Sequence, residues 1–229
     1  MTRVLLVDDE LLAREILRDY LSSDPSIEVV GEASDGRVAV VQAASLRPDV
    51  ILMDMQMPVM DGVAATAQIH ADFPEIAILG GLSTFSTDRY VVDLLRAGAS
   101  GYLVKDTLPK EITAAIHTVM AGESVLSSKV TRHVVTGLAE SVPAEVVPDP
   151  KLVGALTKKE LEVIQLLGRG MSNREMAAEL FVTESTIKAR FVNVMEKLGV
   201  RDRVQILVAA VEGGLVDLSP PGSRTGLGS

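Results

Sequence analysis

The stretch that decides the fold is ILMDMQMPVMDG, residues 51–62. Its apolar run stops at Asp54, and the turn-forming residues Pro58, Asp61 and Gly62 follow before a helical pattern. We therefore predict a buried strand of a parallel sheet that carries one carboxylate at its C-terminal end. Taken alone, Asp54 would be an ordinary strand-ending residue that caps a turn. Open α/β sheets, however, place their chemistry outside the carboxyl ends of the strands.

Composition restricts the class of protein before any motif is considered. The chain has 229 residues, of which 47% are apolar, enough for two ordinary domains with buried cores. It has no Cys, which excludes disulfides, thiolate metal sites and a Cys nucleophile. No apolar run reaches the length of a transmembrane helix, and the first residues resemble a strand rather than a signal peptide. We therefore expect a cytoplasmic protein with no membrane partner.

The negative charge is concentrated in the first half of the chain. Residues 1–122 hold 9 Lys and Arg against 18 Asp and Glu, whereas residues 155–229 hold 10 against 9. The acidity of the whole chain therefore does not argue against nucleic-acid binding by its second half.

Strand and helix patterns alternate five times over residues 1–122. Such alternation predicts a five-stranded, doubly wound parallel sheet of the flavodoxin type, with helices on both faces. The expected strands are residues 3–7, 27–33, 50–54, 76–82 and 101–104.

Right-handed connections bring the C-terminal ends of all five strands to one edge of the sheet. At these ends stand Asp8, Asp9, Asp54, the pair Ser83 and Thr84, and Lys105. Clustered carboxylates repel one another unless a cation lies among them, and a set of oxygen ligands favours Mg²⁺. A carboxylate can also act as a nucleophile and form an acyl phosphate, while a Lys and a hydroxyl bind the phosphoryl oxygens. We assign Asp54 as the nucleophile, and Asp8 and Asp9 as metal carboxylates.

These motifs resemble the receiver domain of two-component response regulators. The matching segments are VLLVDDE at 4–10, DVILMDMQMPVMDG at 49–62, LSTF at 82–85 and AGASGYLVKD at 97–106. The resemblance implies phosphorylation of Asp54 by a sensor histidine kinase and Mg²⁺ held by Asp8, Asp9, Asp54 and the backbone carbonyl of Gln56. It also implies phosphoryl contact by Lys105 and a switch made of a hydroxyl and an aromatic ring, here Ser83 and Tyr102.

The fourth strand departs from the usual pattern, because Gly80 and Gly81 are unusual inside a buried strand. We expect a bulge or a looser switch region here. The pair also leaves open whether Ser83 or Thr84 faces the phosphoryl group, although adjacent residues point to opposite faces of a strand and we favour Ser83.

The middle of the chain changes character. Residues 123–154 are assigned to a linker that contains one helix at about 126–138, and residues 140–154 have three prolines and no period. The last residues, 217–229, are rich in Pro, Gly and Ser, and we expect a disordered tail.

Residues 155–216 have helical periodicity throughout and predict a small four-helix domain. Two capping boxes begin at Thr157 and Ser172, and Thr183 is a favourable N-cap for a helix over 184–198. A short helix, a tight turn and a longer helix form a helix-turn-helix, in which the second helix reads DNA from the major groove. A helical bundle with no such function would have a similar pattern.

The second half resembles the LuxR-type DNA-binding domain of the NarL/FixJ regulators over residues 156–205. The resemblance implies a DNA-contacting lysine at Lys188, and Arg190 stands where the family usually has His. The candidate DNA contacts are Asn173, Thr183, Ser185, Thr186, Lys188, Ala189, Arg190, Val192 and Asn193.

The predicted function is therefore a transcription regulator whose homodimerisation and binding to double-stranded DNA follow phosphorylation of Asp54. The resemblance implies dimerisation through the receiver, the last helix at about 203–213, or both. No catalytic residue is assigned, and the only reaction expected of the protein itself is slow self-dephosphorylation. One alternative is a regulator of the same build that works without phosphorylation. Another is an Asp-nucleophile phosphohydrolase, which would need a second Asp at the position of Gln56.

Overall fold

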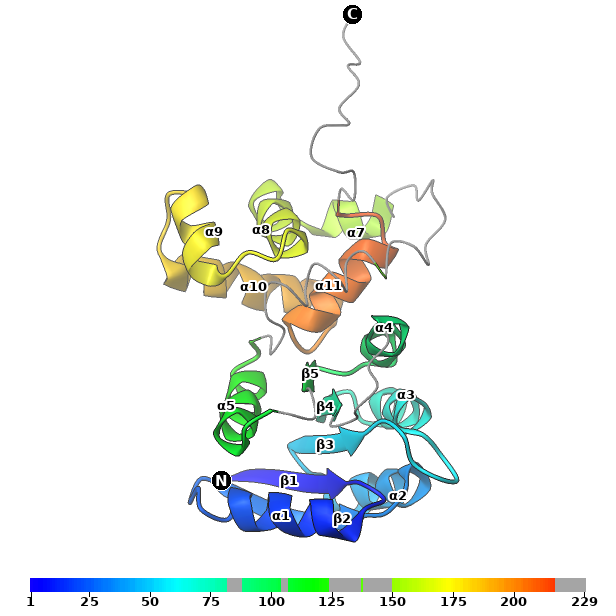
Figure 1. Ribbon diagram of the computed structural model, residues 1–229. Helices are drawn as coiled ribbons and strands as arrows, with labels where there is room; N and C mark the ends of the chain where they lie inside the picture. The colour runs from blue at the N-terminus through cyan, green and yellow to red at the C-terminus, as the bar shows by residue number, and fades with distance from the viewer. Residues whose placement is uncertain (82–87, 104–106, 124–136, 138–149, 217–229) are drawn as a thin grey trace, which may run out of the picture.

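The structure is a computed structural model that describes residues 1–81, 88–103, 107–123, 137 and 150–216. It has two parts, an α/β part built on one sheet and an all-helical part that lies beyond one edge of this sheet (Figure 1). No helix of the described ranges is both long enough and apolar enough to cross a membrane.

Five parallel strands form the sheet in the order β2-β1-β3-β4-β5. Every residue of the central strand β3 is buried, as expected for a strand covered on both faces. The strands are β1 (Thr2–Val7), β2 (Ile27–Ala33), β3 (Val50–Asp54), β4 (Ala77–Gly81) and β5 (Gly101–Leu103).

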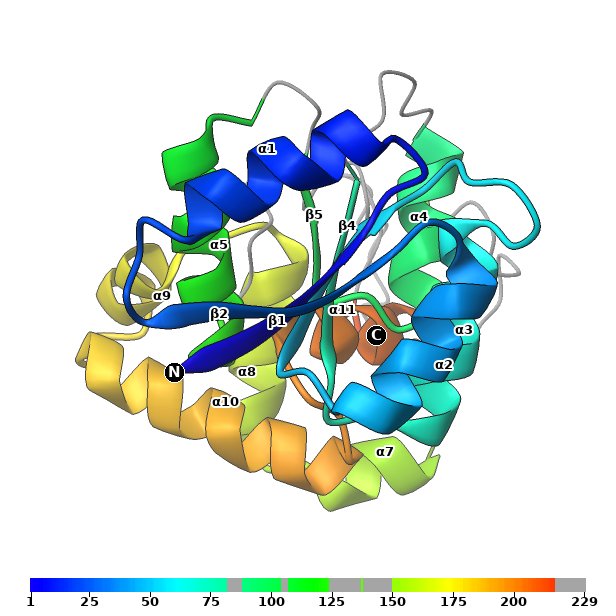
Figure 2. The same ribbon diagram turned by 90° about the horizontal axis from the view of Figure 1, so that it is seen from below.

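Helices cover both faces of the sheet. One face carries α1 (Leu11–Leu21) and α5 (Pro109–Met120), and the other carries α2 (Gly36–Leu46), α3 (Gly62–Asp72) and α4 (Asp88–Arg96) (Figure 2). Neighbouring residues of one strand enter different cores, because successive side chains point to opposite faces. Leu6 joins the core that contains Ile116, whereas Leu5 joins the core that contains Ile69. The predicted doubly wound fold is confirmed.

The two glycines of β4 have packing roles, and the predicted bulge is wrong. The pairing of β3 with β4 continues without a shift through Met53–Gly80 and Asp54–Gly81. A β-carbon on Gly80 would lie 2.3 Å from a methyl group of Leu94, so this glycine lets α4 approach the sheet closely. Gly81 has a φ of 128°, and a β-carbon there would lie 1.8 Å from the carbonyl oxygen of Leu103.

The helical part contains the four predicted helices. Thr157 and Glu160 form one reciprocal cap, Ser172 and Glu175 form a second, and Thr183 caps the longest helix. The helices are α8 (Lys158–Gly168), α9 (Asn173–Glu179), α10 (Glu184–Leu198) and α11 (Arg203–Glu212).

A further helix, α7 (Pro150–Ala155), corrects the assignment of residues 150–154 to the linker. Proline is well placed at the start of a helix, where its missing N–H is not needed. Leu152 of α7 packs against the buried cluster of the helical part, a contact between distant residues that local periodicity does not reveal. The predicted helix at 126–138 and the predicted tail at 217–229 lie outside the described residues, except for Gly137, which is helical.

The two parts meet through α11, which lies between the other main helices and the β5 edge of the sheet (Figure 1). One buried apolar cluster continues across the junction, from Leu94 and Leu95 of α4 to Leu207 and Val211 of α11. The side-chain amide of Gln205 donates hydrogen bonds to the carbonyl oxygens of Leu95 and Ala99, at 3.0 and 2.8 Å.

Candidate functional site

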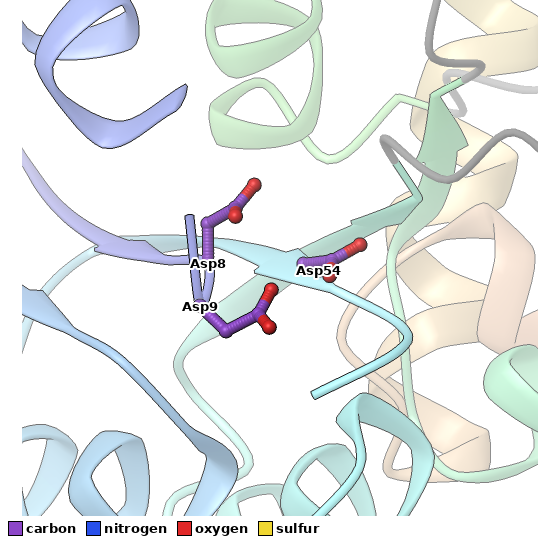
Figure 3. Close-up of side chains that lie close together, drawn as sticks. All are labelled: Asp8, Asp9 and Asp54. Carbon is purple, nitrogen blue, oxygen red and sulfur yellow. The ribbon is translucent and has the colours of Figure 1, made fainter. Parts of the chain in front are cut away.

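Three carboxylates lie together at the C-terminal edge of the sheet. Asp8 and Asp9 follow β1, and Asp54 ends the neighbouring strand β3 (Figure 3). One oxygen atom from each of these three side chains lies within 4.8 Å of the others. The predicted acidic residues therefore converge, as the shared edge of parallel strands requires.

The strand-to-helix junction after Asp54 is held in place by backbone packing. The N–H of Gly62 donates to the carbonyl oxygen of Met55 at 3.1 Å. A β-carbon on Gly62 would lie 2.2 Å from the carbonyl oxygen of Asp54, so only glycine allows α3 to begin this close to the strand end. Asp61 caps α3 by accepting a hydrogen bond from the N–H of Ala64 at 2.8 Å.

Burial and neighbouring charge make the carboxyl group of Asp54 hard to ionise. Its pKa is raised from 3.8 to about 6, first by burial and then by the charge of Asp8, while N–H groups of Met55 and Gln56 act in the opposite direction. Asp8 and Asp54 are both buried, and Asp9 is exposed. A divalent cation among the three would relieve this repulsion, and oxygen-only ligands suit Mg²⁺. The three carboxylates thus fit the metal that the sequence predicts.

The described part of the chain places only some of the other predicted residues of this site. Gln56 is exposed in the loop between β3 and α3. Tyr102 is partly buried in β5 and packs against the cluster that joins the two parts of the molecule. Ser83, Thr84 and Lys105 lie outside the described residues.

The predicted DNA contacts gather on α10 and around its N-terminus. Ser185, Lys188, Ala189, Val192 and Asn193 are exposed on α10 itself. The opposite side of α10, with Ile187, Phe191 and Val194, is buried, so α10 presents one face of mixed polar and apolar residues to solvent.

The remaining candidates lie at the margin of this face. The hydroxyl of Thr183 accepts a hydrogen bond from the N–H of Thr186 at 3.2 Å. Asn173, at the start of α9, accepts from the guanidinium of Arg203 at 2.8 Å. Arg190 is partly buried, and its Nη1 has no hydrogen-bond partner within the described ranges.

Several contacts between the two parts are not evident in the sequence. The Nζ of Lys188 lies 2.6 Å from a carboxylate oxygen of Glu123, just after α5, and Arg96 of α4 pairs with Glu212 of α11 at 2.9 Å. Charged residues of this kind are common on solvated surfaces, and no motif or spacing distinguishes them. Gln205 is likewise a polar residue within an apolar helix, a signal that indicates a buried partner without identifying it.

Comparison with known proteins assigns both halves of the chain. Residues 4–117 match the family described as response regulator receiver domain, and residues 154–210 match the family described as bacterial regulatory proteins, luxR family.

Two similar relatives match over nearly the whole of both chains. The transcriptional regulatory protein LiaR of Bacillus subtilis is 42% identical over 221 residues, which cover 95% of this chain and 100% of the relative. The response regulator protein VraR of Staphylococcus aureus is 37% identical over 214 residues, which cover 93% of this chain and 98% of the relative.

Solved structures agree with this assignment. A two-component response regulator of the LuxR family from Aurantimonas is 29% identical with a TM-score of 0.55, covering 59% of this chain and 96% of that one. The RcsB response regulator of Salmonella typhimurium, at 23% identity and a TM-score of 0.55, covers 90% of this chain and 98% of that one, and supports the fold alone. The chain therefore belongs to the two-component response regulators that join a receiver domain to a LuxR-family domain, and it is a DNA-binding transcription regulator.

Proposed function

We propose that Asp54 is the phosphoryl acceptor of this regulator and that a sensor histidine kinase is the donor. A carboxylate oxygen of Asp54 attacks the phosphorus, the bond between phosphorus and the kinase imidazole breaks, and the imidazole nitrogen keeps the electron pair. The observation that carries the proposal is the meeting of Asp8, Asp9 and Asp54 within 4.8 Å at the ends of neighbouring strands.

The metal that suits this site is Mg²⁺, held by Asp8, Asp9, Asp54 and the backbone carbonyl of Gln56. When bound, it supplies positive charge that offsets the phosphoryl oxygens. Asp54 must be ionised to attack, and because its pKa is about 6 in the metal-free site, most of it is ionised above pH 7. From the similarity to receiver domains we also assign Lys105 to contact with the phosphoryl group. Tyr102 and a hydroxyl residue are assigned to the switch, with Ser83 preferred and Thr84 as the second choice.

The protein is not expected to turn over a separate phosphoester. Gln56 stands where Asp-nucleophile phosphohydrolases carry their second Asp, so a general acid or base is missing from that position. Slow hydrolysis of the acyl phosphate by water would return the regulator to its resting state.

The DNA surface is the exposed face of α10 with its N-terminal turn. Lys188 and Arg190 contact phosphate or base edges, and Ala189 and Val192 can touch thymine methyl groups. The polar candidates Asn173, Thr183, Ser185, Thr186 and Asn193 complete this surface.

A dimer would place two such surfaces on the two half-sites of an operator. We propose that the dimer forms through the receiver domain, through α11, or through both. In the described conformation α4 contacts α11, and Glu123 neutralises Lys188. Phosphorylation is therefore proposed to separate these contacts, which frees α11 for pairing and Lys188 for DNA.

Labelling with acetyl phosphate in the presence of Mg²⁺ tests the acceptor. Wild type should gain one phosphoryl group per chain, and Asp54→Asn should gain none. The matched control is Asp19→Asn, which changes an exposed carboxylate of α1 and should label as wild type does. Labelling of Asp54→Asn at another residue would contradict the assignment.

A second measurement separates this proposal from a regulator that works without phosphorylation. Beryllofluoride mimics a phosphoryl group on the acceptor carboxylate, and it should raise the DNA affinity of wild type but not of Asp54→Asn. Equal affinity of wild type with and without the mimic would favour the alternative.

A further inference from the structure

His70 lies at the junction of the two domains, near the C-terminal end of α3. Its ring packs against the backbone of Gly98, which has a φ of 110°, and a β-carbon on Gly98 would lie 2.2 Å from Cγ of His70. No other residue type would leave room for the imidazole in this position. The His70 side chain is partly buried, and Ala99, the residue after Gly98, accepts a hydrogen bond from Gln205 of α11 at 2.8 Å. The ring therefore lies beside a contact between the two domains.

Two charged groups of the DNA-binding domain act electrostatically on the ring. Arg201 and Asp202, in the turn between α10 and α11, are the charged residues that act on His70. The charges of Asp49 and Glu75 in turn act on Arg201. Asp49 and Glu75 lie at the opposite edge of the sheet from the phosphoryl site. Nδ1 of His70 is buried and has no hydrogen-bond partner in the described part of the chain.

These surroundings oppose a charge on the ring. Burial lowers the pKa of His70 from its ordinary value of 6.5, Asp202 raises it, and Arg201 lowers it, with a net decrease. If the domains separate, water reaches the ring and the pKa returns toward its ordinary value. The separated form therefore takes up a proton at a higher pH than the closed form does.

We propose that His70 makes the closure of the two domains sensitive to protons, so that mild acidification opens the junction. The sign follows from linkage: a histidine whose pKa is lowered in the closed form favours closure above its ordinary pKa. That contribution is lost as the pH falls below 6.5. One proton changes the ratio of open to closed molecules by at most about tenfold per pH unit.

Protonation of Asp202 has the opposite effect on closure, and any test must distinguish this effect from that of His70. Burial raises its pKa, so protonation of this carboxyl group favours the closed form. It also caps α11 by accepting from the N–H groups of Val204 and Gln205 at 2.9 and 3.0 Å. Its ordinary pKa is 3.8, and the open form therefore keeps it ionised throughout a titration that stays near neutrality.

Small-angle scattering of the full-length, unphosphorylated protein can follow the opening directly. The titration runs from about pH 7.5 to about pH 5.8, above the sequence pI of about 4.9. Wild type should expand as the pH falls. His70→Gln stays neutral, can fill the same space and should show no expansion, and His70→Asn serves as a second neutral variant.

The matched control is His117→Gln, on α5, where the ring lies 3.1 Å from Asp24 and away from the junction. It should expand as wild type does. A wild type that keeps its size, or a His70→Gln that expands equally, would overturn the proposal. The third histidine, His133, lies outside the described residues, and loss of the response in His133→Gln alone would also overturn it.

DNA affinity gives an independent readout of the same opening. No histidine occurs in residues 150–229, so the DNA-binding surface has none of its own to titrate. The affinity of wild type should rise between about pH 7.5 and pH 5.8, relative to that of His70→Gln, by several-fold. Because no phosphoryl donor is present, failure of this experiment leaves the assignment of Asp54 untouched.

Discussion

At the scale of single residues, the strongest physical signal is the cost of keeping three carboxylates together. The raised pKa of Asp54 means that the folded, metal-free protein resists ionisation of this group. The proposed function and the stability of the site conflict here, because the charge that Asp54 would need as a nucleophile destabilises the site in the absence of a cation.

Replacing Asp54 with Asn should therefore stabilise the metal-free protein at pH 7.5. Folding favours the protonated carboxyl group, so its contribution is present at low pH and is lost as the pH rises through about 6. A shift from 3.8 to about 6 corresponds to about 1–3 kcal/mol in the free energy of unfolding. Calorimetry in a chelator should give a higher Tm for Asp54→Asn than for wild type.

Added Mg²⁺ should reverse the order. The cation stabilises wild type by binding the folded state, and it has one ligand fewer in Asp54→Asn. Asp19→Asn should follow wild type under both conditions. An equal Tm of wild type with and without Mg²⁺ would contradict the proposed metal site.

At the scale of elements, the junction of β3 with α3 fixes the direction of Asp54. Gly62 allows the first turn of α3 to touch the end of the strand, and Asp61 caps that turn. The sequence predicts a turn at this Asp-Gly pair, and the structure adds the reason that the glycine is required.

Gly62→Ala should destabilise the protein and weaken Mg²⁺ binding. A β-carbon 2.2 Å from the carbonyl oxygen of Asp54 forces the strand end or the helix to move, at a cost of about 1–3 kcal/mol. Gly154→Ala is the matched control, because its β-carbon meets nothing within 4 Å and lies in α7, where alanine should stabilise by about 0.5–1 kcal/mol. Chemical denaturation and Mg²⁺ titration measure both effects, and equal stability of the two variants would refute the packing argument.

At the scale of the whole molecule, α4 connects the sheet with the DNA-binding domain. Leu94 of α4 packs over Gly80 on one side, and the carbonyl oxygens of Leu95 and Ala99 hold Gln205 on the other. A shift of α4 relative to β4 would therefore change the geometry of both hydrogen bonds from Gln205.

Gln205→Ala should favour the open form and raise the DNA affinity of the unphosphorylated protein. Removing two buried hydrogen bonds costs about 1–2 kcal/mol in closure, which corresponds to an increase in affinity of about 5- to 30-fold if closure blocks DNA. Gln68→Ala changes an exposed glutamine of α3 and should leave the affinity unchanged. Filter binding or fluorescence anisotropy measures the DNA affinity of both variants and of wild type.

The beryllofluoride-treated proteins provide the internal check on this prediction. Once the domains are separated, Gln205 no longer holds α4, so Gln205→Ala and wild type should then bind DNA with similar affinity. Weaker binding by Gln205→Ala in both states would indicate a direct role of Gln205 in DNA binding or dimerisation.

The sequence by itself determined the parallel sheet, the convergence of Asp8, Asp9 and Asp54, and the caps of the helical domain. These follow from local signals, because hydrophobic period, strand ends and capping residues act over a few residues. It placed Gly80 and Gly81 in the correct strand but wrongly predicted a bulge there, and it missed α7. The glycines are explained by close contacts with Leu94 and Leu103, and α7 by packing against the helical core.

Only the tertiary structure decided which polar residues join the two domains. Gln205, Glu123 and His70 are far apart in the chain and carry no periodic signal, so nothing local predicts their partners. Contacts between distant segments depend on how completed elements pack together, and this packing is set by shape and charge over the whole surface.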